Sequence, residues 1–178
     1  MTFEAGIIEL AQKLKEQYSS IQTEEATKNA FIMPFISRVL GYDVFNPLEV
    51  VPEFTADHGT KKGEKVDYAI MQDGEVQILI ECKRVGDDLN ITHASQLFRY
   101  FSVTNARIGV LTNGRIFNFF TDLDAPNIMD KRPFLVLDLL EIDESIFPAL
   151  KKITKETFDL DSIISSAEEL KYVGALKR

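Results

Sequence analysis

Two β-rich runs joined by a tight-turn signal constrain the fold more than any other feature of the sequence. Residues 66–71 and 76–85 are rich in branched and aromatic apolar side chains, and Gln-Asp-Gly-Glu at 72–75 separates them. Asp-Gly between two such runs favours a two-residue β-hairpin turn. The Ile-Leu-Ile at 78–80 is typical of a strand that is covered on both faces. The sequence therefore predicts a hairpin near the centre of a sheet.

The segments on either side of this hairpin show helical and strand patterns in turn. Apolar residues recur at helical spacing over 3–18, 23–40, 92–103, 143–153 and 161–177. Strand patterns cover 48–54, 107–112, 115–121 and 133–139. Thr23 and Asp161 are candidate N-caps, and Pro34 predicts a kink or a break in the second helix. This order predicts an α/β fold in which helices pack on a mixed β-sheet.

The domain organisation follows from length and composition. The chain has 178 residues, 45% of them hydrophobic, which is enough to bury one core. It contains no internal repeat, low-complexity tract or shift in composition. We interpret residues 1–178 as a single domain, with a core at 20–140, an N-terminal helix at 1–19 and C-terminal helices at 141–178. The helical pattern is unfinished at Arg178, which favours a native chain that leads into a missing region.

Two classes of protein are excluded by simple counts. The single cysteine, Cys82, excludes a disulfide framework, and with only two histidines there is little to build a zinc site. No apolar run approaches the roughly 18 residues of a membrane span, and the N-terminal segment carries Glu4 and Glu9 where a signal peptide would be basic. We therefore expect a cytoplasmic protein with no membrane partner.

Charge limits where a nucleic acid could bind. The net charge is −8, yet residues 61–119 hold 7 acidic and 8 basic side chains. Phosphate binding depends on local Lys and Arg, so DNA would have to meet this middle segment. The candidate DNA-binding residues are Lys61, Lys62, Lys65, Arg84 and Arg99. Taken singly, each of them is better explained as an ordinary solvated charge.

Acidic and basic side chains meet at the end of the second β-run. Side chains alternate along a strand, so Glu81 and Lys83 share one face while Cys82 points to the other. Asp67 lies on the preceding strand of the same hairpin. Two carboxylates on adjacent strands are suitable ligands for a hard cation, typically Mg²⁺. The alternative for Glu81 and Lys83 alone is a surface ion pair at a strand end.

The hairpin register creates a geometric condition for this site. A regular two-residue turn pairs residue 72 with 75 and sets Asp67 opposite Ile80, on the wrong face relative to Glu81. The site therefore requires a longer loop, a β-bulge or a strand bend.

Two further groups accompany the carboxylates. Gln96 and Tyr100 are four residues apart and share one helix face, where they could orient water or a DNA phosphate. Glu24 and Glu25 open the second helix. The alternatives are a helix flank packed on the sheet for the first pair and acids that complement the helix dipole for the second.

These residues in this order resemble a nuclease family. Glu24, Asp67, Glu81-Cys82-Lys83 and Gln96-x-x-x-Tyr100 are similar to the motifs of the PD-(D/E)xK nuclease superfamily. More narrowly, they resemble the N-terminal nuclease domain of type I restriction enzyme R subunits, as do residues 24–47 and 110–120. The resemblance spans roughly residues 20–140, and Val66 stands where the family nominally has Pro.

The resemblance implies a restriction-endonuclease-like fold and a Mg²⁺-dependent DNA endonuclease, with Mn²⁺ as a possible substitute. Asp67, Glu81 and the backbone carbonyl of Cys82 would then hold the metal. Lys83 would orient the attacking water and stabilise charge on the scissile phosphate. Glu24, or alternatively Glu25, would reach the metal through water. Gln96 and Tyr100 would position DNA or the lysine.

The sequence also lacks the nucleotide-binding motif of the ATP-driven motor that R subunits contain. Nothing in it matches the Gly-x-x-x-x-Gly-Lys-Ser/Thr phosphate loop of an ATP-driven motor. We therefore expect other restriction-system subunits, or a missing C-terminal region, to be partners of the chain. The alternative function is a non-catalytic DNA-docking or protein-interaction module that retains the nuclease fold.

Overall fold

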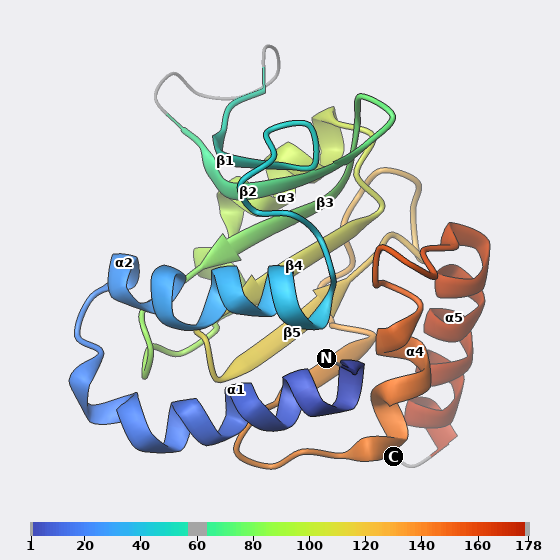
Figure 1. Cartoon of the computed structure of the whole chain (residues 1–178). Helices are drawn as coiled ribbons and strands as arrows, with labels where there is room; N and C mark the ends of the chain where they lie inside the picture. Colours follow the sequence, from blue (N-terminus) through green and yellow to red (C-terminus); the bar gives the residue numbers. More distant parts are fainter. Residues whose placement is uncertain (1, 57–63, 177–178) are drawn as a thin grey trace.

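A six-stranded mixed sheet forms the centre of the molecule. The structure, a computed structural model, describes residues 2–56 and 64–176 (Figure 1). Strands lie in the sheet in the order in which they occur in the chain, and only β3 and β4 pair in parallel. The strands are β1 (Val50–Phe54), β2 (Val66–Gln72), β3 (Glu75–Cys82), β4 (Ile108–Thr112), β5 (Ile116–Phe120) and β6 (Leu135–Asp138). The α/β architecture expected from the sequence is confirmed.

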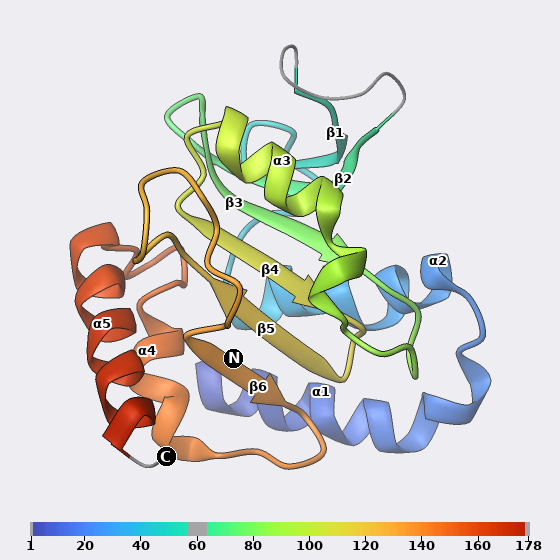
Figure 2. The ribbon, with the colours of Figure 1, turned by 180° about the vertical axis from the view of Figure 1, so that it is seen from behind.

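Helices cover both faces of the sheet. The helix α1 (Phe3–Gln17) and the helix that begins with α2 (Glu24–Thr27) lie on one face, and α3 (Ser95–Val103) lies on the other (Figures 1 and 2). The connection from β3 through α3 to β4 is the crossover that parallel strands need. At the end of the chain, α4 (Phe147–Lys151) and α5 (Leu160–Leu176) pack beside each other.

The second helix is irregular around its proline. After α2 the chain forms wide π-helical turns at Lys28–Ile32 and Phe35–Val39, one on each side of Pro34. The expected disturbance at Pro34 is therefore present, and it takes the form of widened turns within a continuous helix. Thr23 caps this helix as predicted, because its hydroxyl accepts a hydrogen bond of 3.0 Å from the Ala26 amide.

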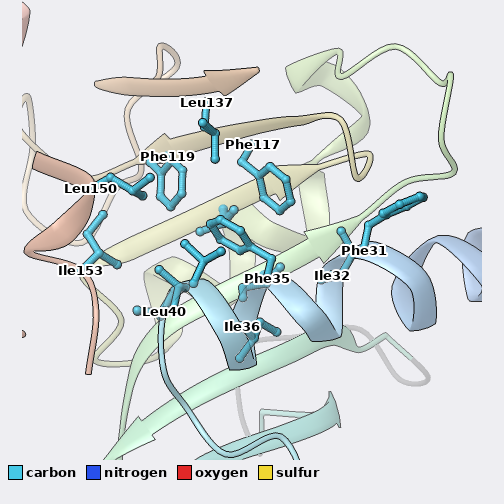
Figure 3. Packing of buried hydrophobic residues seen from close by; sticks show 14 of the residues in the cluster. Phe31, Ile32, Phe35, Ile36, Leu40, Phe117, Phe119, Leu137, Leu150 and Ile153 are labelled. Carbon is cyan, nitrogen blue, oxygen red and sulfur yellow. The ribbon is translucent and has the colours of Figure 1, made fainter. Parts of the chain in front are cut away.

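Two hydrophobic cores lie on opposite faces of the sheet. In the first, Phe35 stacks on Phe117 with ring centroids 4.1 Å apart, and Leu137 lies close by (Figure 3). The second core gathers α3 residues such as Leu97 against the other face. Along β3, the side chains of Ile78, Ile80 and Cys82 belong to the first core and Leu79 belongs to the second. The alternation predicted for this strand, including the buried Cys82, is confirmed.

Several predicted boundaries are wrong in detail. β3 ends at Cys82 and not at residue 85, because the chain turns at Val85 and Gly86. Asp161 is not the N-cap of α5, which begins one residue earlier; the Asp159 carboxylate accepts a hydrogen bond of 3.3 Å from the Ser162 amide instead. Residues 57–63, between β1 and β2, lie outside the described part of the chain. No helix in the described part is long and apolar enough to cross a bilayer.

Candidate active site

A β-bulge brings the two predicted carboxylates together. The Asp73-Gly74 turn is the predicted two-residue turn: both residues have positive φ, and Gln72 pairs with Glu75. Met71 then pairs with Val76 but Ile70 pairs with Ile78, so Gln77 is an extra residue in β3. The paired residues end at Tyr68 and Ile80, and beyond them the side chains of Asp67 and Glu81 come within hydrogen-bonding distance of each other. The β-bulge at Gln77 is thus one of the irregularities that the sequence requires for Asp67 and Glu81 to share a face.

Asp67 is held by two groups. Its Oδ2 accepts a hydrogen bond of 2.7 Å from the backbone amide of Cys82, the residue after Glu81. Its Oδ1 lies 2.7 Å from the Nζ of Lys28. Both side chains are largely withdrawn from water, with 14% of Asp67 and 13% of Lys28 exposed. Burial alone would lower the pKa of Lys28, but the hydrogen bond and charge of Asp67 raise it above its ordinary value.

Glu81 is a buried carboxyl group at the end of β3. It is only 7% exposed, and burial together with the charge of Asp67 raises its pKa to about 8. A hydrogen bond between the two carboxyl groups acts in the same direction, because the protonated Glu81 donates to Asp67. Without a metal, Glu81 therefore holds its proton at neutral pH.

The structure distinguishes the two glutamates of α2. The Glu24 carboxyl group faces the site, and its pKa is raised by partial burial and by the nearby charge of Asp67. Glu25 is 74% exposed and pairs with Lys28 at 3.6 Å on the outer side of the helix. Lys83 lies near both Glu24 and Glu81 and lowers the pKa of each. Glu24, Asp67, Glu81 and Lys83 are thus brought to one place.

The helix that carries Glu24 is attached to the sheet next to this site. Thr27 is fully buried; its hydroxyl accepts a hydrogen bond of 3.0 Å from the Val85 amide and donates one of 2.9 Å to the Thr23 carbonyl. Gly114 leaves room for this contact, since a Cβ there would lie 3.0 Å from the Thr27 methyl group. Thr27 therefore holds α2 against the segment that follows Lys83.

The two α3 residues occupy different environments. Tyr100 is fully buried, and its hydroxyl donates a hydrogen bond of 2.6 Å to the Glu64 carbonyl. Arg99 binds the Glu64 carboxylate through two nitrogens, at 3.1 and 2.6 Å. Both contacts fix the chain three residues before Asp67. Gln96 is half-buried one turn before Tyr100.

The predicted DNA-binding cations are mostly neutralised by neighbouring acids. Lys65 pairs with Glu53 at 3.3 Å, Arg84 with Asp87 at 3.2 Å, and Arg99 with Glu64. Lys61 and Lys62 lie outside the described residues. Lys83, in contrast, forms no ion pair within the described ranges.

Sequence reasoning missed Lys28, Thr27 and Glu64. The only signal for Lys28 was its place four residues after Glu24, which puts both on one helix face. Thr27 is an ordinary helical residue in the sequence, and Glu64 lies outside every predicted helix and strand.

The donor chemistry at the site fits a hard divalent cation. Mg²⁺ is commonly bound through one or two carboxylates, with water and phosphate oxygens completing its shell. Asp67 and Glu81 supply two such carboxylates at adjacent positions on neighbouring strands. In the described part of the chain, no group of three or more His, Cys, Asp or Glu residues is arranged to hold a metal. Asp67 and Glu81 are two carboxylates, so a cation held by them would take its remaining ligands from the main chain, water or substrate.

Comparisons with known proteins support the fold and relate part of the sequence to a known family. A chain of the cryo-EM structure of a DrdV–DNA complex has a similar fold, with a TM-score of 0.52 and 13% sequence identity, over 83% of this chain and 97% of that one. No curated protein matches the sequence significantly. Residues 46–128 match the family described as type I restriction enzyme R protein N terminus.

The matched segment contains Asp67, Glu81 and Lys83, together with α3 and the strands from β1 to β5. Glu24 and Lys28 precede it. The resemblance indicated by the motifs is thus confirmed: on a restriction-endonuclease-like α/β fold, residues 46–128 match the N-terminal region of type I restriction enzyme R proteins.

Proposed function

We propose that this chain is a Mg²⁺-dependent DNA endonuclease domain of the restriction type. The observation that carries the proposal is the bulge at Gln77, which shifts the register so that Asp67 and Glu81 interact, while Lys83 follows two residues later. A regular hairpin would have separated the two acids on opposite faces. The family match over residues 46–128 supports the same assignment.

In this proposal, each residue of the site has a separate role in phosphodiester hydrolysis. Asp67, Glu81 and the Cys82 carbonyl would hold the metal, and Glu24 would reach it through water. Bound there, Mg²⁺ supplies Lewis-acid polarisation of the phosphate and lowers the pKa of water, and Mn²⁺ can substitute for it. Glu81 must lose its proton to serve as a ligand, so its raised pKa disfavours metal binding at low pH.

Lys83 is the cation that we expect to act on substrate. Its ammonium forms no ion pair in the described part of the chain, although it lies near Glu24 and Glu81. It would orient the attacking water and stabilise negative charge on the scissile phosphate. Gln96 would contact DNA from α3, whereas Tyr100 acts on the site indirectly, because its hydroxyl holds the Glu64 carbonyl.

DNA is the proposed partner, and the similar chain in the DrdV–DNA complex supports it. Contacts would come from Lys83 and from Lys61, Lys62, Lys65, Arg84 and Arg99. Because the net charge is −8, we expect other restriction-system subunits or a further region of the chain to supply most of the DNA affinity. The buried free thiol of Cys82 is compatible with a cytoplasmic setting.

Plasmid cleavage tests the proposal. The purified chain is incubated with supercoiled plasmid and Mg²⁺ or Mn²⁺, beside Asp67→Asn and Lys83→Ala. We expect each substitution to lower the cleavage rate about a hundredfold or more. The matched controls are Asp73→Asn in the turn of the same hairpin and Lys15→Ala on α1, which should cut like the parent chain. Equal cutting by all five proteins would refute the assigned roles.

A second candidate function is a non-catalytic DNA-docking or protein-interaction module. It is favoured by the Lys28–Asp67 ion pair, which already neutralises one of the two acids. Calorimetric titration with Mn²⁺ separates the two functions. A nuclease site gives a binding heat that disappears in Glu81→Gln, whereas a docking module gives no heat that depends on Glu81.

A further inference from the structure

Lys28 makes a contact with Asp67 that the proposed hydrolysis does not require. Its Nζ lies 2.7 Å from Asp67 Oδ1, and both side chains are at least 86% buried. The ammonium thus occupies one of the two oxygens through which Asp67 would hold a metal. The other oxygen, Oδ2, accepts a hydrogen bond from the Cys82 amide.

A role in attaching α2 to the sheet does not explain why Lys28 carries a charge. Thr27 already joins α2 to Val85, and Phe31 and Ile32 are fully buried in the first core. A buried ion pair is also a weak source of stability compared with apolar packing of the same volume. The charge of Lys28 is explained by what it contacts, which is a carboxylate that would otherwise lie buried without a counter-ion.

The ammonium has a second acceptor near the solvent. Glu25 Oε2 lies 3.6 Å from the same Nζ, on a side chain that is 74% exposed. A change of the Lys28 rotamer can therefore move the charge from Asp67 to Glu25 without leaving it unpaired. A divalent cation on Asp67 would favour that movement, because two cations on one carboxylate repel each other.

We propose that Lys28 is a resident counter-ion of the metal site, which holds Asp67 when no metal is bound and is displaced toward Glu25 when a divalent cation binds. Lys28 is in this sense a positioning residue, and it sets the metal affinity of the site. The inference rests on the proposed metal-dependent function, and it predicts a thermodynamic competition between the ammonium and the metal.

Metal binding to the full chain tests the competition without reference to cleavage. Mn²⁺ is titrated by calorimetry into the parent chain, Lys28→Met and Lys83→Met. Both substitutions remove one positive charge near the carboxylates, but only Lys28 contacts Asp67. We expect Lys28→Met to bind Mn²⁺ about tenfold more tightly than the parent, equivalent to about 1.4 kcal/mol, and clearly more tightly than Lys83→Met.

A second variant covers the case in which Lys28→Met does not fold. Lys28→Arg keeps the charge, and its guanidinium can hold both oxygens of Asp67 at once. It should therefore bind Mn²⁺ several-fold more weakly than the parent. Thermal melts give a second readout: without metal, Lys28→Met should melt below the parent, and added Mn²⁺ should raise its melting temperature more.

The outcomes distinguish the two proposals. If the parent binds Mn²⁺ through Glu81 but Lys28→Met binds no more tightly than Lys83→Met, the competition is overturned and the metal site stands. Equal or tighter binding by Lys28→Arg overturns the competition as well. If neither the parent nor Lys28→Met binds Mn²⁺, both the metal-dependent function and the competition fail.

Discussion

At the scale of single residues, the site is defined by a proton and an ammonium that compensate two buried acids. Glu81 keeps its proton to an unusually high pH because it is buried beside Asp67, and Asp67 contacts the Lys28 ammonium and the Cys82 amide. The two acids thus have different partners. In the proposed function, one divalent cation would replace the proton of Glu81.

The raised pKa of Glu81 predicts how stability depends on pH. A carboxyl group whose pKa is higher in the folded state stabilises the fold at low pH, and this contribution is lost as pH rises. Between pH 4.5 and about 8, the free energy of unfolding of the metal-free protein should therefore fall because of Glu81. The slope from this one group is at most about 1.4 kcal/mol per pH unit.

Urea denaturation over this pH range, with Glu81→Gln as the comparison, measures the effect. The amide is neutral at every pH and can still donate a hydrogen bond to Asp67, so the variant should lose less stability than the parent. A parent and variant whose stabilities fall in parallel would show that Glu81 ionises normally.

At the scale of elements, the contact between α2 and the segment that follows β3 holds the parts of the site together. The Thr27 hydroxyl makes this contact by accepting a hydrogen bond from the Val85 amide. The same helix carries Glu24, and Lys28 follows directly after α2. Thr27→Val keeps the shape of the side chain but leaves the buried Val85 amide without its partner. We expect a loss of about 1–3 kcal/mol in the free energy of unfolding.

Thr27→Ser is the matched control, because it keeps the hydroxyl and removes only a buried methyl group. It should cost about 1 kcal/mol or less. Denaturant titration of both variants gives the comparison, and a serine variant as unstable as the valine variant would assign the effect to packing and not to the hydrogen bond.

The same scale shows what sequence patterns predict and what they do not. Alternation along β3 is a local property, and it correctly placed Cys82 in the first core and Glu81 on the other face. The bulge is not local. Val76 packs in the second core and Ile78 in the first, so Gln77 has to be an extra residue between them. Only the assembled two-sided sheet imposes that requirement.

At the scale of the whole molecule, several basic side chains in the described part of the chain are already paired with acids. Arg84 and Arg99 are paired with Asp87 and Glu64, while Lys83 has no such partner in the described ranges. Each phosphate contact contributes about one unit to the slope of log K against log salt. Lys83→Gln should therefore reduce the magnitude of that slope by about one.

Fluorescence anisotropy with labelled duplex DNA at a series of salt concentrations measures the slope. Lys15→Gln, which removes an exposed charge from α1, is the control and should leave the slope unchanged. Equal slopes for the parent and Lys83→Gln would show that Lys83 does not contact phosphate.

The whole molecule also explains why the sequence did not reveal Lys28. The order of motifs predicted that Glu24, Asp67, Glu81 and Lys83 belong together, and the structure brings them to one place. The partner of Asp67, however, lies 39 positions earlier in the chain and in a different element. Contacts of this kind depend on how a helix crosses a sheet, which no pattern in a single sequence specifies.

The contacts that join α2 to the sheet link residues far apart in the chain, and this has a consequence for folding. The Asp67–Glu81 pair lies on one hairpin and can form early, whereas the Thr27–Val85 hydrogen bond closes a separation of 58 positions and is delayed by loop entropy. A folding intermediate with the hairpin alone would hold two adjacent carboxyl groups without the Lys28 ammonium that contacts Asp67 in the native structure. Divalent ions in the refolding buffer should be captured by such an intermediate before the native helix arrives.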